Sequence, residues 1–513
     1  MSYSKVGRIL GKIMILEGIL MFLPLIVCVF YAESFINYIA FLVPSIVLIV
    51  LGSIIQMLRK SNEGLYQKEG FALVALVWII MTLFGAIPFV INGDIPNYID
   101  ACFEIMSGFT TTGASIIVDI TSVCHSTLFW RSFSHWIGGM GILVFVLIFI
   151  PESNEGSSMH LLRAESPGPQ VGKIVSKMKV TTRILYSIYL VLSVLQVIIL
   201  MCDKPIEGYE NEKFFFSLLT TFGSAGTGGF SFIPNSMQLY SPFSQYVIAV
   251  FLILYGCNFS LYYLILIGKA KEAVKSEELR VYLGIIAFSV LSIFITLVVN
   301  VGLLAVNYTT EEAFRHSLFQ VVSLVTTTGY TTTDYVAWPM YGQMMLLILT
   351  FFGAMAGSTC GGIKISRVVI AFKGIVVSVR KLINPRYVPK AHFEGKTLDE
   401  KTQNDVFAFF TMYIFILFIV TLLLALDPVN GSTVTITSDA GTYSVTHGFF
   451  SSFTSTLSCL SNIGPGFEAV GPYSSFAAYS GFSKILLTLS MLFGRLEILP
   501  VMILFSPKTW KKM

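Results

Sequence analysis

The stretch SLVTTTGYTTTD, residues 323–334, interrupts an apolar chain with a cluster of threonines around one glycine. A second stretch, SGFTTTGAS, repeats the pattern at residues 107–115. In all, four segments share one plan, in which a polar start leads into a short apolar run and then a break rich in Thr, Ser and Gly. These segments are residues 98–115, 212–231, 311–331 and 446–467. Each is too short for a bilayer span, which takes about 20 helical residues, so each predicts a re-entrant helix and loop.

Composition places the chain in a lipid bilayer. Hydrophobic residues make up 55% of the 513, and charged residues make up 12%. A soluble domain carries about 25% charged residues. Apolar runs recur from end to end, which indicates one integral membrane unit rather than a soluble domain with an anchor. The net charge of +4, without a long basic block, gives no reason to expect a nucleic-acid partner.

Ten apolar stretches are long enough to span the bilayer. They are residues 13–31, 38–58, 71–91, 127–150, 182–202, 245–268, 280–302, 340–376, 405–426 and 478–505. If the N-terminus is inside, the connections on that side hold 27 of the 33 lysines and arginines. By the positive-inside rule, this bias predicts that both termini are cytoplasmic.

The four re-entrant segments each lie between two spans, so the chain divides into repeats. The predicted units are an N-terminal helix pair and four span–pore helix–span repeats. Their bounds are 1–66 for the pair and 67–160, 161–275, 276–400 and 401–513 for the repeats. The predicted fold class is therefore an all-α polytopic membrane protein.

The break in each segment suits a cation pathway. Successive backbone carbonyls can replace the hydration shell of a cation, and glycine allows the positive φ angles that such a backbone visits. The short helix before each break aims its partially negative C-terminus at the pore centre. A single motif of this kind fits the packing of small residues between helices. Four in register, at Gly113, Gly228, Gly329 and Gly464, indicate an ion pore.

The four-repeat plan and five further stretches resemble the Trk/Ktr/HKT superfamily of potassium transport proteins. The stretches are WRSFSHWIGGMGI (130–142), LLRAESPGP (161–169), AGSTCGGIK (356–364), NPR (384–386) and FGRLEI (493–498). The N-terminal helix pair and the AESPGP segment are most similar to bacterial TrkH-type potassium uptake subunits. The resemblance implies a potassium-channel-like fold within one chain, in the bacterial cytoplasmic (inner) membrane.

The resemblance also implies a potassium selectivity filter, with one tripeptide from each break. Its residues are Thr111, Thr112 and Gly113; Gly226, Thr227 and Gly228; Thr327, Thr328 and Gly329; and Asn462, Ile463 and Gly464. Asn462 and Ile463 depart from fourfold symmetry, and Tyr330 has no counterpart in the other loops. We therefore expect fewer well-defined ion sites than in a symmetric tetramer. K⁺ is the expected transported ion, and a sodium-selective or sodium-coupled transporter of the same fold is the alternative.

Two features of the inner spans predict a gate. Gly353, Gly357, Gly361 and Gly362 lie in the middle of the eighth span, where each costs about 1 kcal/mol in a regular helix. From the residues alone, a close-packed GxxxG face fits equally well, whereas the resemblance implies a flexible loop that obstructs the pore below the filter. Arg495 lies within the last span. It is either part of a structural ion pair or, as the resemblance implies, an electrostatic barrier beside that loop.

Other function classes lack their motifs. The predicted spans carry no nucleophile elbow, no H-E-x-x-H pair and no phosphate-binding turn, so we expect no enzyme and no bound nucleotide. The resemblance implies a homodimer and a cytosolic nucleotide-binding, TrkA-like ring as regulator. Nine basic residues in 364–404 fit a docking surface for that ring, and they fit membrane topology and lipid head groups equally well.

Overall fold

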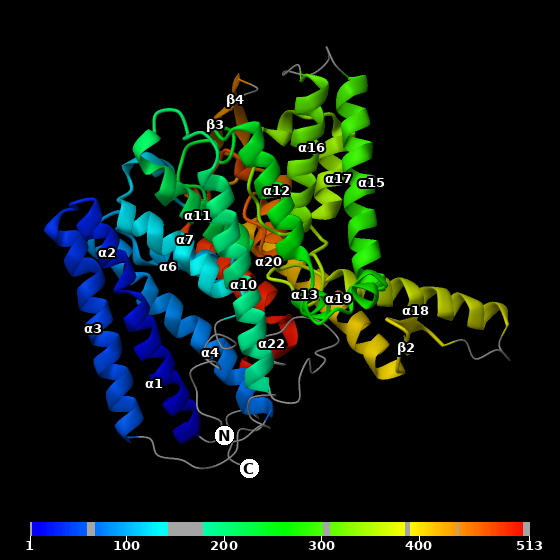
Figure 1. Cartoon of the computed structure of the whole chain (residues 1–513), viewed down its shortest axis with the longest axis horizontal. Helices are drawn as coiled ribbons and strands as arrows, with labels where there is room; N and C mark the ends of the chain where they lie inside the picture. Colours follow the sequence, from blue (N-terminus) through cyan, green and yellow to red (C-terminus); the bar gives the residue numbers. More distant parts are fainter. Residues whose placement is uncertain are drawn as a thin grey trace.

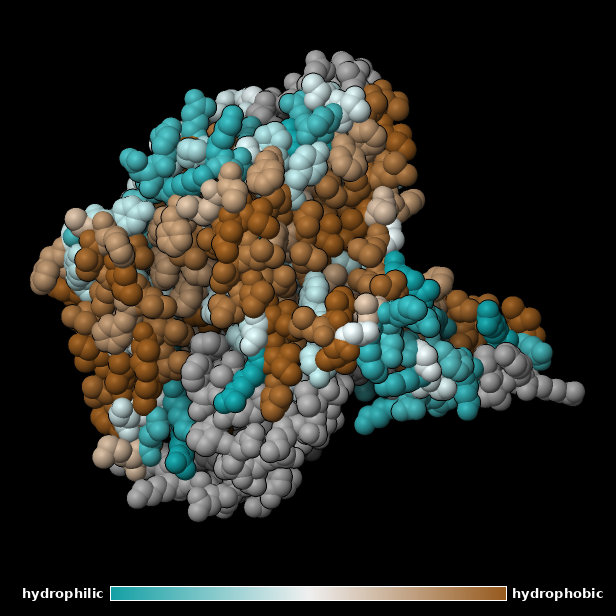
Figure 2. Space-filling model, in the orientation of Figure 1, coloured by the Kyte–Doolittle hydropathy of each residue, from teal (hydrophilic) through white to brown (hydrophobic). Residues whose placement is uncertain are grey.

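The structure is a computed structural model that describes residues 3–58, 67–141, 178–300, 308–384, 390–438 and 441–505. Nearly all of its regular structure is helical (Figure 1). Apolar side chains cover most of the middle of the visible face, below a polar upper end (Figure 2). The prediction of a helical membrane protein is confirmed. The AESPGP segment lies outside the described residues.

Within those residues, six helical stretches are long and apolar enough to cross a membrane. They are Val6–Phe30, Phe35–Met57, Glu69–Ile91, Val180–Met201, Glu277–Val299 and Glu400–Leu424. The first two form the N-terminal pair, built from α1 (Tyr3–Leu20), α2 (Leu23–Phe30) and α3 (Phe35–Leu58). This pair packs against the first repeat, since α1 contacts α4 (Gln67–Gly85) and α3 contacts α5 (Ile87–Ile91).

Each of the four repeats consists of an outer helix, a short pore helix and an inner helix. The outer helices are α4, α10 (Met178–Met201), α15 (Glu277–Val299) and α19 (Glu400–Leu424). The pore helices are α6 (Tyr98–Phe109), α11 (Lys213–Gly226), α16 (Thr310–Val325) and α20 (Phe449–Ser461). Local capping fixes where some of them begin. In α16, for example, Thr309 and Glu312 form a reciprocal capping box.

The inner helices begin at α7 (His125–Gly139), α12 (Pro242–Gly256), α17 (Met340–Leu349) and α21 (Gly481–Leu496). The sequence predicted an interruption only in the third repeat. In the structure, α12 and α13 (Phe259–Leu266) also meet at 90°, and α21 gives way to α22 (Ile498–Phe505) at Glu497, whose φ is +61°. The prediction of unbroken inner spans at 245–268 and 478–505 is therefore wrong, and part of 127–150 lies outside the described residues.

The third inner helix has the longest non-helical interruption of the described inner helices. Residues 350–364 separate α17 from α18 (Ile365–Ile383), which projects sideways at the lower right of Figure 1. The glycines predicted for the gate therefore lie in a non-helical segment rather than on a GxxxG helix face. We call residues 350–364 the intramembrane loop.

The remaining elements are short. Two antiparallel hairpins interrupt the helical fold: β1 (His392–Phe393) with β2 (Lys396–Thr397), and β3 (Thr433–Ser438) with β4 (Gly441–Thr446). The β3–β4 hairpin stands at the top of Figure 1, whereas β2 lies near α18. The other short helices are α14 (Ala270–Val274) and the 3-10 turns Ile120–Ser122, Glu210–Glu212, Tyr335–Ala337 and Glu468–Val470.

Candidate ion pore

The four pore helices end in the same hydrogen-bonded turn. In each turn, one N–H group donates to the carbonyl five residues earlier, at 2.8–3.0 Å. The pairs are Thr112 to Ser107, Gly228 to Gly223, Thr328 to Ser323 and Ile463 to Ser458. The residue before each donor has a positive φ of 51–57°, and these residues are Thr111, Thr227, Thr327 and Asn462. The residue after each donor is a glycine with positive φ: Gly113, Gly229, Gly329 or Gly464.

This geometry corrects the predicted register of the second loop. The sequence alignment placed Gly226, Thr227 and Gly228 beside the other tripeptides, but the turn consists of Thr227, Gly228 and Gly229. Gly226 is instead the last residue of α11. The run GTGG allows both registers, and only the backbone angles distinguish them.

The backbone and the buried side chain of His135 explain why this loop holds extra glycines. A Cβ atom on Gly228 would lie 2.3 Å from His135 Nδ1, and one on Gly226 would lie 2.2 Å from the His135 carbonyl oxygen. His135 itself stacks on Phe230, with ring centroids 4.3 Å apart. The first inner helix therefore packs directly against the second turn.

The four turns close into a ring of backbone atoms. A Cβ atom on Gly113, Gly229 or Gly329 would lie 1.9 Å from a carbonyl oxygen of the next turn. These oxygens belong to Gly228, Thr328 and Ile463, respectively. The cycle closes where a Cβ on Gly464 would lie 2.8 Å from the carbonyl oxygen of Thr112. We call this arrangement the carbonyl ring; only glycine fits at these four positions.

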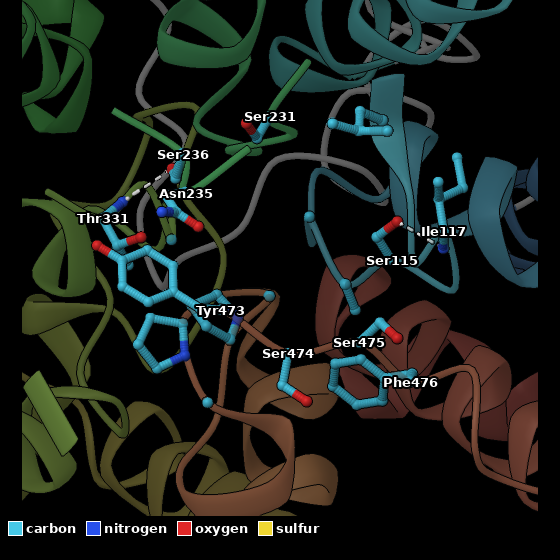
Figure 3. A pocket seen from close by; sticks show the side chains of 18 of the residues that line it. Ser115, Ile117, Ser231, Asn235, Ser236, Thr331, Tyr473, Ser474, Ser475 and Phe476 are labelled. Carbon is cyan, nitrogen blue, oxygen red and sulfur yellow. Dashed lines mark hydrogen bonds between the residues drawn. The ribbon is translucent and has the colours of Figure 1, made fainter. Parts of the chain in front are cut away.

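Contacts above the ring fasten each turn to its neighbours. The Phe476 N–H donates to the Ser115 carbonyl at 2.8 Å, and the Thr331 N–H donates to the Ser236 hydroxyl at 3.1 Å. Figure 3 shows these loops arranged around one cavity. The two remaining junctions are the Arg131 guanidinium donating to the Ser231 carbonyl at 3.1 Å and the Tyr335 hydroxyl donating to the Gly466 carbonyl at 2.8 Å.

A cavity of about 510 Å³ lies above the ring and is lined by all four of its positive-φ glycines. The β3 residues Val434, Thr435 and Ile436 border it as well. Arg131 also lines the cavity, but its charge is paired with the buried carboxylate of Glu104 at 2.6 Å. Glu104 additionally accepts the Ile116 N–H at 2.9 Å, so this ion pair holds the chain that leaves the first turn.

Tyr330, which has no counterpart in the other loops, is matched by a change in its neighbour. The residue whose carbonyl accepts the turn hydrogen bond is a serine in the first, third and fourth turns, namely Ser107, Ser323 and Ser458. In the second turn it is Gly223. A Cβ on Gly223 would lie 2.0 Å from the Tyr330 hydroxyl oxygen. The fully buried tyrosine therefore occupies the space that a serine would need, and the third loop packs against the second pore helix.

The intramembrane loop lies directly beneath the ring. The Gly361 N–H donates to the Thr327 hydroxyl at 2.7 Å, and a Cβ on Gly361 would lie 2.7 Å from the Ser461 carbonyl oxygen. The two limbs of the loop meet where the Gly353 N–H donates to the Ile363 carbonyl at 2.8 Å. Gly357 and Gly362 adopt positive φ angles of 75° and 64°. All four predicted gate glycines thus belong to one compact loop below the candidate filter.

Arg495 joins this loop to the first and fourth repeats. Its guanidinium donates to the carbonyls of Gly138 at 2.5 Å, Gly139 at 2.7 Å and Thr359 at 2.8 Å, and to the Thr111 hydroxyl at 3.2 Å. The side chain is buried beneath the ring. The neighbouring Glu497 forms an ion pair with Arg367 at 2.6 Å.

Two polar side chains of this region make contacts that the sequence did not predict. The Lys364 ammonium is buried and donates to the Cys360 carbonyl at 2.5 Å. The Asn462 amide donates to the Thr112 hydroxyl and to the Met491 carbonyl, both at 2.9 Å. Spacing along the chain could not reveal either contact. The departure of Asn462 from the threonine pattern was the one available signal.

Comparisons with known proteins show the family of the chain. A TrkH family model, described as a cation transport protein, matches residues 38–512. The Trk system potassium uptake protein TrkH of Salmonella typhimurium is 32% identical over 519 residues, which cover 100% of both chains. The Trk system potassium uptake protein TrkG of Escherichia coli is 31% identical, over 99% of this chain and 98% of that protein.

A solved structure matches over the same extent. The crystal structure of the potassium transporter TrkH from Vibrio parahaemolyticus superposes with a TM-score of 0.83 at 28% sequence identity. The match covers 100% of each chain. The N-terminal pair and all four repeats therefore fall within it.

Proposed function

The chain belongs to the TrkH family of cation transport proteins, and from that premise we propose that it takes up potassium through the carbonyl ring. The single observation that carries the proposal is the closed cycle of four turns, in which glycine α-carbons face the carbonyl oxygens of the next turn. Such oxygens can replace the hydration shell of a dehydrated cation. The filter consists of the predicted residues, with Gly229 added and Gly226 removed from the ion-facing turn.

Electrostatics favours a cation in this ring. All four pore helices run directly into the turns, so their C-terminal ends point at it. Each end carries about half a negative elementary charge. The fourth turn has Asn462 and Ile463 where the first and third have threonines, so the ring lacks full fourfold symmetry. This asymmetry supports selectivity for potassium over sodium that is weaker than in a symmetric channel.

The intramembrane loop and Arg495 form the gate in this proposal. The loop fills the space under the ring, and the guanidinium places a positive charge there. A cation leaving the filter would meet both obstacles. Conduction therefore requires the loop to move away from Thr327 and Arg495.

The basic connections support an orientation with α18, the β1–β2 hairpin and both termini in the cytoplasm, and with the 510 Å³ cavity outside. The five predicted units, bounded at residues 66, 160, 275 and 400, serve as the functional division of the chain.

We place the protein in the bacterial cytoplasmic membrane as a homodimer. Exposed apolar residues of the projecting α18, including Phe372 and Leu382, support a contact surface there. A cytosolic nucleotide-binding, TrkA-like ring completes the proposed assembly.

Flux measurements on purified protein in liposomes test this function. Potassium and rubidium fluxes that exceed the sodium flux are the expected result, and protein-free liposomes provide the baseline. A sodium flux larger than the potassium flux would favour the sodium-selective alternative. Absence of any cation flux, including in the Arg495→Ala variant, would overturn the proposal.

A further inference from the structure

One carboxylate connects the intramembrane loop to the start of α18. Glu278 is the second residue of α15, and its side chain is buried. Its Oε1 atom accepts the Ala356 N–H at 2.8 Å and the Ser366 N–H at 3.0 Å. Ala356 lies within the loop, whereas Ser366 lies in the first turn of α18. A single side chain from outside the loop therefore ties the loop to the helix that follows it.

The start of α18 depends on this side chain. The first N–H groups of a helix lack partners within it and are usually satisfied by a capping side chain. Lys364, the N-cap residue of α18, provides no such hydrogen bond. Glu278 supplies the acceptor instead, and its negative charge suits the positive end of the helix dipole.

A second carboxylate binds the start of α15, including the backbone of Glu278. Glu394 follows β1 in the β1–β2 hairpin, and its Oε1 atom accepts the Ser276 hydroxyl at 2.8 Å and the Glu278 backbone N–H at 3.0 Å. The same hairpin is tied to α18, since the Lys373 ammonium donates to the His392 carbonyl at 2.6 Å. The hairpin thus contacts both helices whose ends meet at the loop.

From these contacts we propose that Glu278 is a positioning residue that holds the gate closed, and that Glu394 couples it to the β1–β2 hairpin. Displacing the hairpin withdraws Glu394 from the start of α15, which moves Glu278 and frees Ala356 and Ser366. The inference rests on the proposed role of the intramembrane loop as the gate. It adds where a cytoplasmic signal would act on that loop.

The first test measures potassium flux in liposomes containing the full-length chain. Glu278→Ala should raise the flux about fivefold or more, a scale set by the loss of charge-assisted hydrogen bonds. Glu278→Gln keeps an oxygen acceptor of the same length and should give an intermediate flux. Glu272→Ala is the matched control, because the Glu272 carboxylate is exposed and pairs only locally with Lys269 in the contacts described; it should leave the flux unchanged.

The second test asks whether the two carboxylates act as one unit. Glu394→Ala should raise the flux, and the Glu278→Ala, Glu394→Ala double variant should not exceed Glu278→Ala by more than about twofold. Effects of the two substitutions that multiply would show independent action and overturn the coupling. Flux unchanged in every Glu278 variant would overturn the positioning role.

A readout without ion flux separates these outcomes from misfolding. Cys360 lies in the intramembrane loop and is fully buried. In a variant with the other six cysteines replaced, a charged thiol reagent applied from the cytoplasmic side should label Cys360 several times faster after Glu278→Ala. If Arg495→Ala raises flux while Glu278→Ala changes neither flux nor labelling, this inference fails and the gate stands. If Glu278→Ala speeds labelling and neither variant raises flux, the gate proposal fails.

Discussion

The carbonyl ring and the intramembrane loop lie in direct contact but are held in opposite ways. The ring consists of four turns of the same type, one from each repeat, and each turn is held by an equivalent backbone hydrogen bond. The loop occurs in the third repeat alone among the described residues. Two backbone hydrogen bonds join it to the second inner helix, at Gly256 and Phe259. Its other contacts outside the third inner helix come from side chains, chiefly Glu278, Thr327 and Arg495. Backbone contacts repeated in a closed ring resist movement, whereas a few side-chain contacts can be released together.

The inner helices show how the difference arises. The second, third and fourth inner helices are all interrupted below the ring, at Cys257, at 350–364 and at Glu497. Only the third interruption is long enough to fold back beneath the turns. A fourfold framework can therefore set the selectivity while one repeat supplies the moving part.

Breaking the ring should have the largest effect. In Gly329→Ala, the new Cβ would lie 1.9 Å from the Ile463 carbonyl oxygen, at a φ of +82°. Left-handed backbone costs roughly 1–2 kcal/mol for a residue with a Cβ, and the overlap adds to that cost. Potassium flux should fall at least about a hundredfold, a change of roughly 2.8 kcal/mol in an equilibrium, when measured in liposomes.

The control for this substitution lies in the same repeat. A Cβ on Gly342 of α17 would lie 3.5 Å from its nearest neighbour, Trp338, which is an ordinary contact. Gly342→Ala should therefore retain transport. Normal flux in Gly329→Ala would show that ions do not pass between these turns.

Removing the Arg495 side chain, which binds the loop and carries a positive charge under the ring, should raise the potassium flux. Arg495→Ala deletes the guanidinium that donates to the Gly138, Gly139 and Thr359 carbonyls, and with it the positive charge under the ring. Potassium flux should rise about tenfold, which corresponds to about 1.4 kcal/mol in the gate equilibrium. Lys484→Gln, on the same helix but paired with Asp100, is the control. A flux that stays unchanged or falls in stable Arg495→Ala protein would contradict a role as barrier.

The same contrast separates what the sequence predicts from what it leaves open. The ring repeats a local pattern, so Gly113, Gly329 and Gly464 could be found by aligning the chain with itself. Gly229 could not be predicted because the run GTGG fits two registers of the turn. The observed register is accompanied by packing against His135, which is distant in the sequence. The contacts by which other elements hold the loop also join distant parts of the chain. Nothing near Glu278 in the sequence indicates that Ala356 and Ser366 are its partners.

A smaller effect is expected at the junction of the two regions. Thr327→Val removes the hydroxyl that accepts the Gly361 N–H at 2.7 Å, and valine keeps the shape of the side chain. One hydrogen bond contributes about 0.5–1.5 kcal/mol, so potassium flux should rise roughly two- to tenfold as the loop loosens. A drop in flux would show instead that the hydroxyl serves the permeating ion. Ion competition between potassium and sodium, measured on the same variant, distinguishes the two roles.

Tyr330→Phe, like Thr327→Val, removes one buried hydroxyl beside the carbonyl ring. It should have the smallest effect. The Tyr330 hydroxyl lies 3.4 Å from the Thr220 carbonyl, a long hydrogen bond, while the buried ring fills the space beside Gly223. Phenylalanine keeps the packing of the ring and loses only the contact of the hydroxyl oxygen. Because backbone hydrogen bonds hold the turns, flux and the potassium-to-sodium ratio should change less than about twofold. That is about 0.4 kcal/mol, below the 0.5–1.5 kcal/mol of a typical hydrogen bond. A loss of selectivity in Tyr330→Phe would mean that side-chain contacts, and not the repeated backbone turn alone, set the width of the ring.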